Sequence, residues 1–298
     1  MPVKVRILIE RLFIAVVFGL IWSGGAVAAE SPSIEQQIDA YLADKVSAAG
    51  IPGLAVAVVH DGAVIFNRAY GVRRLGKKEK LTPEHVFHFA SVSKPFVATA
   101  IVQLAEKGKL KLDDPVVKHL PYFRLADERY SEITLRQMLN HTAGMPDVKD
   151  YEWDSPQFDR GAAERYVRSM SSQQLLWAPG TGWHYSNMAY DVLGDLIAKV
   201  SGLSFEEYMR INILEPIGMV NSSFIYPEID KKLRTTGHTG DPARVSAVYP
   251  YNRRHAPSST LNASVADMTR WMLVNLNWGE LDGRRILSDE SYDLLWTA

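Results

Sequence analysis

The spacing of hydrophobic positions near the N-terminus predicts a helix. Ser33-Ile34-Glu35-Gln36 places a glutamine three residues after a serine, which is the pattern of a capping box at a helix start. Apolar residues then recur at helical spacing until Gly50 and Pro52, two residue types that end helices. The apolar positions are Ile34, Ile38, Tyr41, Leu42 and Val46.

After Pro52 the hydrophobic pattern becomes typical of strands. Residues 54–59 form a continuous apolar run rich in valine, and residues 63–70 are again largely apolar. Asp61-Gly62 lies between the two runs, and an Asp-Gly pair favours the tight turn of a β-hairpin. The fold is therefore predicted to begin with one helix and two antiparallel strands.

From residue 95 onward, helical periods dominate and are separated by glycine and proline. Helices are predicted over residues 95–107, 134–140, 163–169, 188–200, 204–213 and 264–276. Strands at one end and helices in the middle predict an α+β fold. We expect an antiparallel sheet flanked by helices, with a mainly helical subdomain at about residues 95–260.

Residues 1–29 have the layout of a secretory signal peptide. Lys4 and Arg6 precede an apolar run at residues 12–22, and Ala26-Val27-Ala28 supplies small residues for cleavage. The apolar run is shorter than the ~20 residues of a transmembrane helix. We therefore expect cleavage near Ala28 or Ala29, a mature domain at residues 30–298 without a membrane span, and a periplasmic or secreted location. The alternative is an uncleaved N-terminal anchor.

Composition excludes several functions. Without residues 1–29, 30 Lys and Arg and 33 Asp and Glu remain, a net charge of −3 that gives no basis for a nucleic-acid partner. The chain has no cysteine, which excludes disulfides, a thiol nucleophile and cysteine-bound zinc. We expect a small-molecule or peptide substrate and no cofactor, while the pattern leaves the oligomeric state undefined.

Ser91-Val92-Ser93-Lys94 is the strongest chemical signal in the chain. It stands at the start of the helix predicted at residues 95–107. Positions i and i+3 share a helix face, so Lys94 is predicted to approach the hydroxyl of Ser91. A nucleophile at a helix N-terminus also gains backbone N–H donors for a developing oxyanion. The alternative is that Ser91 only caps the helix.

A second signal, Tyr185-Ser186-Asn187, lies in a loop just before the helix predicted at residues 188–200. A loop in this position can present a phenol and an amide to a cleft. A tyrosine becomes a competent base when a nearby cation stabilises its phenolate, and Lys94 would supply that cation. The alternative is a capping loop with Asn187 as the N-cap.

The histidines give weaker signals. His85 and His88 are spaced i, i+3, without the His-Glu-x-x-His pattern of zinc hydrolases, and His141 has no evident carboxylate partner. We interpret His141 as part of a structural loop beside the cleft. The chain also contains no G-x-S-x-G, so an α/β-hydrolase nucleophile elbow is not supported.

Taken in order, these segments resemble the serine β-lactamase-related family, which comprises class C β-lactamases, D-alanyl-D-alanine carboxypeptidases and serine esterases. The resemblance runs from about Ile34 to the last residue and implies a β-lactamase/transpeptidase-like fold. The matching motifs are Phe89-Ala90-Ser91-Val92-Ser93-Lys94, Leu110-Lys111-Leu112-Asp113-Asp114-Pro115, Leu139-Asn140-His141-Thr142-Ala143-Gly144-Met145, Pro179-Gly180-Thr181-Gly182-Trp183-His184-Tyr185-Ser186-Asn187, Leu214-Glu215-Pro216-Ile217-Gly218-Met219 and Ser264-Val265-Ala266-Asp267-Met268.

The resemblance implies a role for each motif residue. Ser91 would be the acylated nucleophile and Lys94 its proton partner. Tyr185 would be the general base and acid, and Asn187 would hydrogen-bond the acyl side of the substrate. One oxyanion donor would be the backbone N–H of Ser91.

The second oxyanion donor comes, in this family, from an edge strand near a third motif such as Lys-Thr-Gly or His-x-Gly. His238-Thr239-Gly240 has this composition, but it precedes the helix at residues 264–276, whereas the family places the motif after that helix. We therefore expect His238 to lie in a loop without a catalytic role. The motif and its C-terminal strands are expected after Ala298, which would make this chain a truncated one.

Three functional hypotheses follow. The leading one is an exported serine hydrolase that forms an acyl-enzyme on Ser91 with an ester, a β-lactam or a D-Ala-D-Ala type peptide. The second is a non-catalytic ligand- or penicillin-binding protein without a complete oxyanion hole. The third and weakest is a metal-dependent hydrolase using His85, His88 and His141.

Overall fold

The N-terminal hairpin has the geometry that its sequence predicts. In the computed structural model, which describes residues 32–296, β1 (Gly53–His60) pairs antiparallel with β2 (Ala63–Gly71). Asp61 and Gly62 both have positive φ, at 47° and 74°, as a two-residue type I′ turn requires. The pairing shifts register after Val58, where a bulge adds twist.

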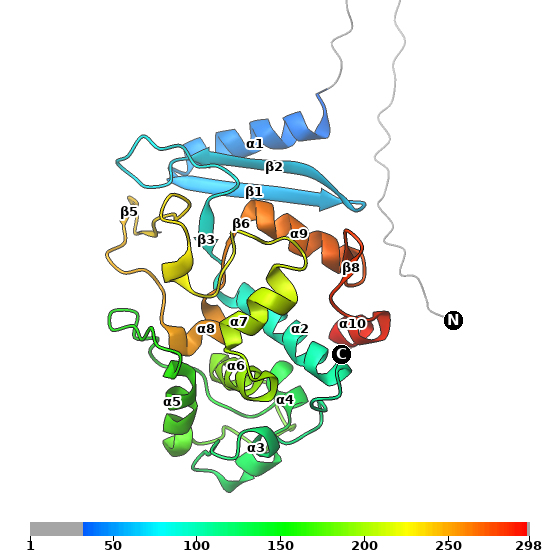
Figure 1. The fold of residues 1–298 in the computed structure, drawn as a ribbon. Helices are drawn as coiled ribbons and strands as arrows, with labels where there is room; N and C mark the ends of the chain where they lie inside the picture. The colour runs from blue at the N-terminus through cyan, green and yellow to red at the C-terminus, as the bar shows by residue number, and fades with distance from the viewer. Residues whose placement is uncertain (1–31, 297–298) are drawn as a thin grey trace, which may run out of the picture.

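Two helices cover the hairpin from opposite sides (Figure 1). α1 (Ile34–Ala48) starts with the predicted capping box and packs mainly on β2, while α9 (Val265–Leu276) packs mainly on β1. The predicted apolar stripe of α1 is only partly used, because Ile34 and Tyr41 are more than half exposed and only Val46 is buried. In this helix, hydrophobic spacing predicted the element but not how deeply its apolar face is buried.

The remaining strands are short and form separate pairs. β3 (Val86–His88) pairs with β6 (Asn262–Ser264), β4 (His238–Thr239) with β5 (Arg244–Val245), and β7 (Glu280–Leu281) with β8 (Arg284–Arg285). Within residues 32–296 the strands therefore make four two-stranded antiparallel sheets rather than one continuous sheet. The fold is α+β, as predicted.

Helices and loops form the other half of the molecule (Figure 1). The helices are α2 (Ser93–Glu106), α3 (Val116–His119), α4 (Leu135–Leu139), α5 (Ala162–Ser169), α6 (Asn187–Ser201), α7 (Phe205–Met209), α8 (Ala256–Ser259) and α10 (Asp289–Trp296). Each helix predicted from the sequence is present, although the one expected at residues 204–213 divides into α7 and a π-helical turn, Arg210–Leu214.

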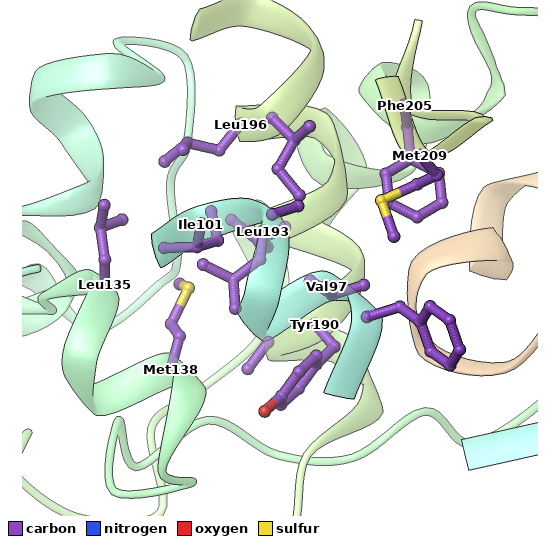
Figure 2. Close-up of a cluster of buried hydrophobic side chains, with 14 of the residues drawn as sticks. Val97, Ile101, Leu135, Met138, Tyr190, Leu193, Leu196, Phe205 and Met209 are labelled. Atoms are coloured by element: carbon purple, nitrogen blue, oxygen red, sulfur yellow. The ribbon is translucent and has the colours of Figure 1, made fainter. Parts of the chain in front are cut away.

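The main core lies where α2 crosses α6. Both helices are buried on nearly all sides, which agrees with their largely apolar sequences. Figure 2 shows Val97 and Ile101 of α2 against Leu193 of α6, with Met138 of α4 beside them; all four side chains are fully or almost fully buried. This packing brings the N-terminal end of α2, with Ser91 before it, close to the N-terminal end of α6, with Tyr185 before it.

Among the described residues no helix is both long and apolar enough to span a bilayer. The signal segment predicted at residues 1–29 lies outside the described residues.

Candidate active site

Ser91 lies in a 3₁₀ turn, Ala90–Val92, that leads directly into α2. The alternative that Ser91 caps the helix is wrong, because the N-cap of α2 is Val92 and that of the 3₁₀ turn is Phe89. Ala90 has φ +46°, an unfavourable backbone conformation for a non-glycine residue. The hydroxyl of Ser93 holds the turn by donating to the carbonyl of Ala90 (2.7 Å) and accepting from the N–H of Leu261 (2.9 Å). Ser91 is left exposed in this turn, directly before the start of α2.

Lys94 is buried, with 5% of its surface exposed, and its ammonium group has three acceptors. Nζ donates to Ser91 Oγ (3.2 Å), to Asn187 Oδ1 (2.6 Å) and to the carbonyl of Ser258 (2.8 Å). An ammonium has three N–H donors, so this arrangement satisfies all of them. Because the acceptors come from three separate chain segments, the position of Nζ depends on the tertiary structure.

The phenol of Tyr185 completes the contact with the nucleophile. Its Oη donates to Ser91 Oγ at 2.8 Å, so the hydroxyl of Ser91 lies between the phenol and the amine. Lys94 Nζ is also 4.8 Å from the centre of the Tyr185 ring and 5.5 Å from that of Tyr190, both within cation–π range. The structure thus brings together the three side chains that the sequence singled out.

Asn187 is held from both sides. Its Oδ1 accepts from Lys94, while its Nδ2 donates to the carboxylate of Asp147 at 3.0 and 3.2 Å. The backbone N–H of Asn187 also donates to Asp147 Oδ1 (2.8 Å). Because a carboxylate only accepts, Asp147 determines which end of the amide faces Lys94. The N-cap of α6 is Ser186, not Asn187 as the alternative interpretation had it.

His141 supports Tyr185 from behind. Its ring lies 4.5 Å from the ring of Tyr185 and 5.2 Å from that of Tyr190, and its Nδ1 accepts the backbone N–H of Ser186 at 3.2 Å. Burial and the positive charge of Lys94 lower the pKa of His141 to about 4. The ring is therefore neutral at pH 7 and packs as an aromatic surface beside the phenol.

The other histidines lie in different surroundings. His85 contacts Thr82, and His88 packs edge-on against Tyr249. Burial lowers the pKa of His88 to about 4. His238 accepts the backbone N–H of Leu75 and lies in the short strand β4 rather than in the loop that was expected. Within residues 32–296 no three His, Asp or Glu side chains form a group that could bind a metal ion.

Two parts of this site were not found from the sequence. Asp147 is one carboxylate in a loop with several, and only the fold shows that it contacts Asn187. Ser258 contributes its backbone carbonyl. Every residue has this group, so the sequence cannot indicate which one accepts from Lys94.

A serine hydroxyl held between a buried lysine amine and a tyrosine phenol, at the start of a helix, is the arrangement expected of a serine hydrolase that works without histidine. The comparisons with known proteins agree with this class. A family profile described as "Beta-lactamase" matches residues 35–298. The chain belongs to this β-lactamase family of serine hydrolases and has its β-lactamase/transpeptidase-like fold.

Among curated relatives, Protein flp of Staphylococcus aureus (strain COL) is 31% identical over 245 residues, which cover 82% of this chain and 49% of that protein. Penicillin-binding protein 4* of Bacillus subtilis (strain 168) is 33% identical over 177 residues, 57% of this chain and 37% of that protein. The octameric penicillin-binding protein homologue from Pyrococcus abyssi has a similar structure, with TM-score 0.74 and 28% identity, over 86% of this chain and 58% of that one. The chain thus spans about half the length of the Staphylococcus aureus relatives it matches.

Proposed function

We propose that this chain is an exported serine hydrolase that forms an acyl-enzyme on Ser91 and releases the acyl group to water. The observation that carries the proposal is the contact of one exposed serine hydroxyl with both a phenol (2.8 Å) and a buried amine (3.2 Å). Such an arrangement of nucleophile and proton-transfer groups is what acyl transfer requires.

In the acylation step Tyr185 acts as the phenolate, after its phenol proton has passed to solvent, and the Ser91 hydroxyl then donates across the same 2.8 Å contact. Ser91 Oγ attacks the carbonyl carbon of the substrate, and its proton passes to Tyr185 Oη. Lys94 stays cationic and stabilises that phenolate. The negative charge that develops on the carbonyl oxygen is stabilised by the backbone N–H of Ser91 at the helix start. When the tetrahedral intermediate collapses, Tyr185 donates the proton to the leaving group, and the acyl group remains on Oγ.

Deacylation repeats these steps with water as the nucleophile. Tyr185 Oη accepts a proton from the water, the water oxygen attacks the ester carbonyl, and the proton returns to Ser91 Oγ as the C–O bond breaks. The same phenol acts as base and then as acid in each half-reaction.

The substrate class is an ester or an amide, among them simple esters, β-lactams and D-Ala-D-Ala type peptides. Two exposed apolar side chains beside the site favour substrates with an apolar acyl group. Val92, next to the nucleophile, is 38% exposed, and Trp183 is 65% exposed with its ring 6.1 Å from that of His141. Export is proposed from the signal segment predicted at residues 1–29.

The direct test is labelling with a fluorophosphonate and with a fluorescent penicillin, followed by intact-mass analysis. The wild-type protein should gain one adduct on Ser91, and Ser91→Ala should lose both the adduct and hydrolysis of a chromogenic ester. Ser131→Ala is the matched control, because this exposed serine donates to the carbonyl of Glu128 in a turn away from the site and its loss should leave the labelling of Ser91 unchanged. Equal ester hydrolysis by wild type and Ser91→Ala would refute the proposal.

The non-catalytic binding protein is distinguished by the time course of the adduct. A hydrolase forms the ester adduct and then clears it, with product release in step. A binding protein retains ligand reversibly, with no mass change on Ser91.

A further inference from the structure

A second pair of polar side chains lies behind the Lys94 site, in the interior. His255 Nδ1 and Asp191 Oδ2 are 2.7 Å apart, and both side chains are completely buried. The other polar atoms, His255 Nε2 and Asp191 Oδ1, have no hydrogen-bond partner among the described residues. The rings of Tyr166 and Tyr151 pack edge-on against the imidazole, with centres 4.6 and 5.0 Å away.

The two partners lie on the same segments that supply acceptors to Lys94. Asp191 follows Asn187 by one helical turn on α6, so both side chains are on one face. His255 precedes Ser258 by three residues, and its carbonyl accepts the hydroxyls of Ser258 (3.2 Å) and Ser259 (3.0 Å). The pair therefore links α6 to the start of α8 one turn deeper than the link through Lys94.

These two segments are also in close contact. A Cβ built on Gly194 of α6 would lie 1.9 Å from Cγ of Pro257 in α8. Gly194 is three residues after Asp191, so the tight contact and the His255–Asp191 pair are on the same side of α6. Sterics limit how near the segments come, and the 2.7 Å hydrogen bond limits how far they separate.

A fully buried ionisable pair is seldom the most stabilising choice, since apolar residues of similar volume are often as stabilising or more so. The hydrogen bond between His255 and Asp191 instead fixes the orientation of the two segments relative to each other and the distance between them. We propose that His255 and Asp191 are positioning residues that hold Asn187 Oδ1 and the Ser258 carbonyl at the spacing that keeps the Lys94 ammonium on Ser91. This inference rests on the proposed function, because its kinetic consequence is the rate of acylation.

The test replaces both partners at once, by His255→Leu with Asp191→Leu. Removing one partner alone would leave a buried polar group unpaired and could unfold the protein, whereas the double replacement keeps an apolar interior. We expect the double variant to fold with a Tm close to that of the wild type and to react with a fluorophosphonate at Ser91 at least about tenfold more slowly. His255→Asn, whose amide nitrogen can replace Nδ1 as the donor to Asp191, should recover most of the rate.

The matched control is the other buried ion pair of this region, Arg253 with Glu206, at 2.7 and 3.0 Å. Arg253 lies two residues before His255, so this pair joins the same chain segment to α7. Its hydrogen bonds do not involve Asn187 or the Ser258 carbonyl, the two groups that accept from Lys94. Arg253→Met with Glu206→Leu should change the labelling rate less than about threefold. Equal labelling rates for wild type and the His255→Leu, Asp191→Leu variant would overturn the inference.

Crystal structures of the wild type and the double variant provide a readout that does not depend on activity. We expect the distances from Lys94 Nζ to Asn187 Oδ1 and to the Ser258 carbonyl to increase in the double variant. Unchanged distances would overturn the inference. A wild-type protein that is not labelled at all would instead refute the proposed function, and the crystal structures would still decide the role of the pair.

Discussion

Replacing Asp147 tests how far the site depends on the orientation of one amide. Asp147 accepts from both the backbone N–H and Nδ2 of Asn187, and this leaves Oδ1 facing Lys94 at 2.6 Å. In Asp147→Leu nothing on that side selects the orientation, so the hydrogen bond between Asn187 and Lys94 is weakened or lost. A hydrogen bond to a charged group is worth about 1.5–3 kcal/mol, which corresponds to roughly 10- to 150-fold in rate.

The assay is the second-order rate constant for labelling of Ser91 by a fluorophosphonate, measured together with thermal unfolding. Asp147→Asn keeps an acceptor oxygen for Asn187 and should lose less than about tenfold. Asp150→Asn, which changes a carboxylate in the same loop that accepts from the N–H of Glu152, is the control and should react like the wild type. A folded Asp147→Leu protein that labels at the wild-type rate would refute this reasoning.

Three further predictions concern the phenol, the neutral histidine and the packing of α6. Tyr185→Phe keeps the ring but removes the hydroxyl that contacts Ser91, so labelling should slow by about 10²–10⁴-fold with little change in Tm; a rate within threefold of wild type would contradict the role of the phenol. The pKa of His141 is about 4 in the folded state and about 6.5 when unfolded, so the unfolded chain binds more protons between these values, and stability in urea should fall as pH drops from 6.5 to 4. In His141→Asn the stability should fall less steeply over this pH range. An equally steep fall would contradict the assignment of the pH dependence to His141. Gly194→Ala places a methyl group against Pro257 and should destabilise the fold by about 1–3 kcal/mol in thermal unfolding, whereas a raised Tm would show that α8 can move aside.

Local sequence was sufficient for much of the fold. The capping box of α1 and the Asp-Gly turn of the hairpin are interactions between residues three or fewer apart, so they appear in the structure as predicted. The same holds for the helices whose apolar spacing predicted them. Burial was less predictable, as the exposed Ile34 and Tyr41 of α1 show, because burial depends on which other segments cover a face.

The pairing of strands was also beyond the local pattern. β3 and β6 are three residues each and lie more than 170 residues apart in the chain. Such short strands have little periodicity of their own, and their pairing depends on contacts made by the rest of the fold.

For the site, the residue types and spacing of Ser91, Lys94 and Tyr185 were enough to single out the chemistry, because a serine and a lysine three residues apart share a helix face. The sequence could not show what orients them. Asp147, the carbonyl of Ser258 and the buried pair of His255 with Asp191 act from segments 53 to 167 residues away from Ser91 and Lys94 along the chain, and only the tertiary structure brings them together. The residues of the proposed chemistry lie in a few local motifs, whereas the geometry that brings them together comes from packing between α2, α6 and α8.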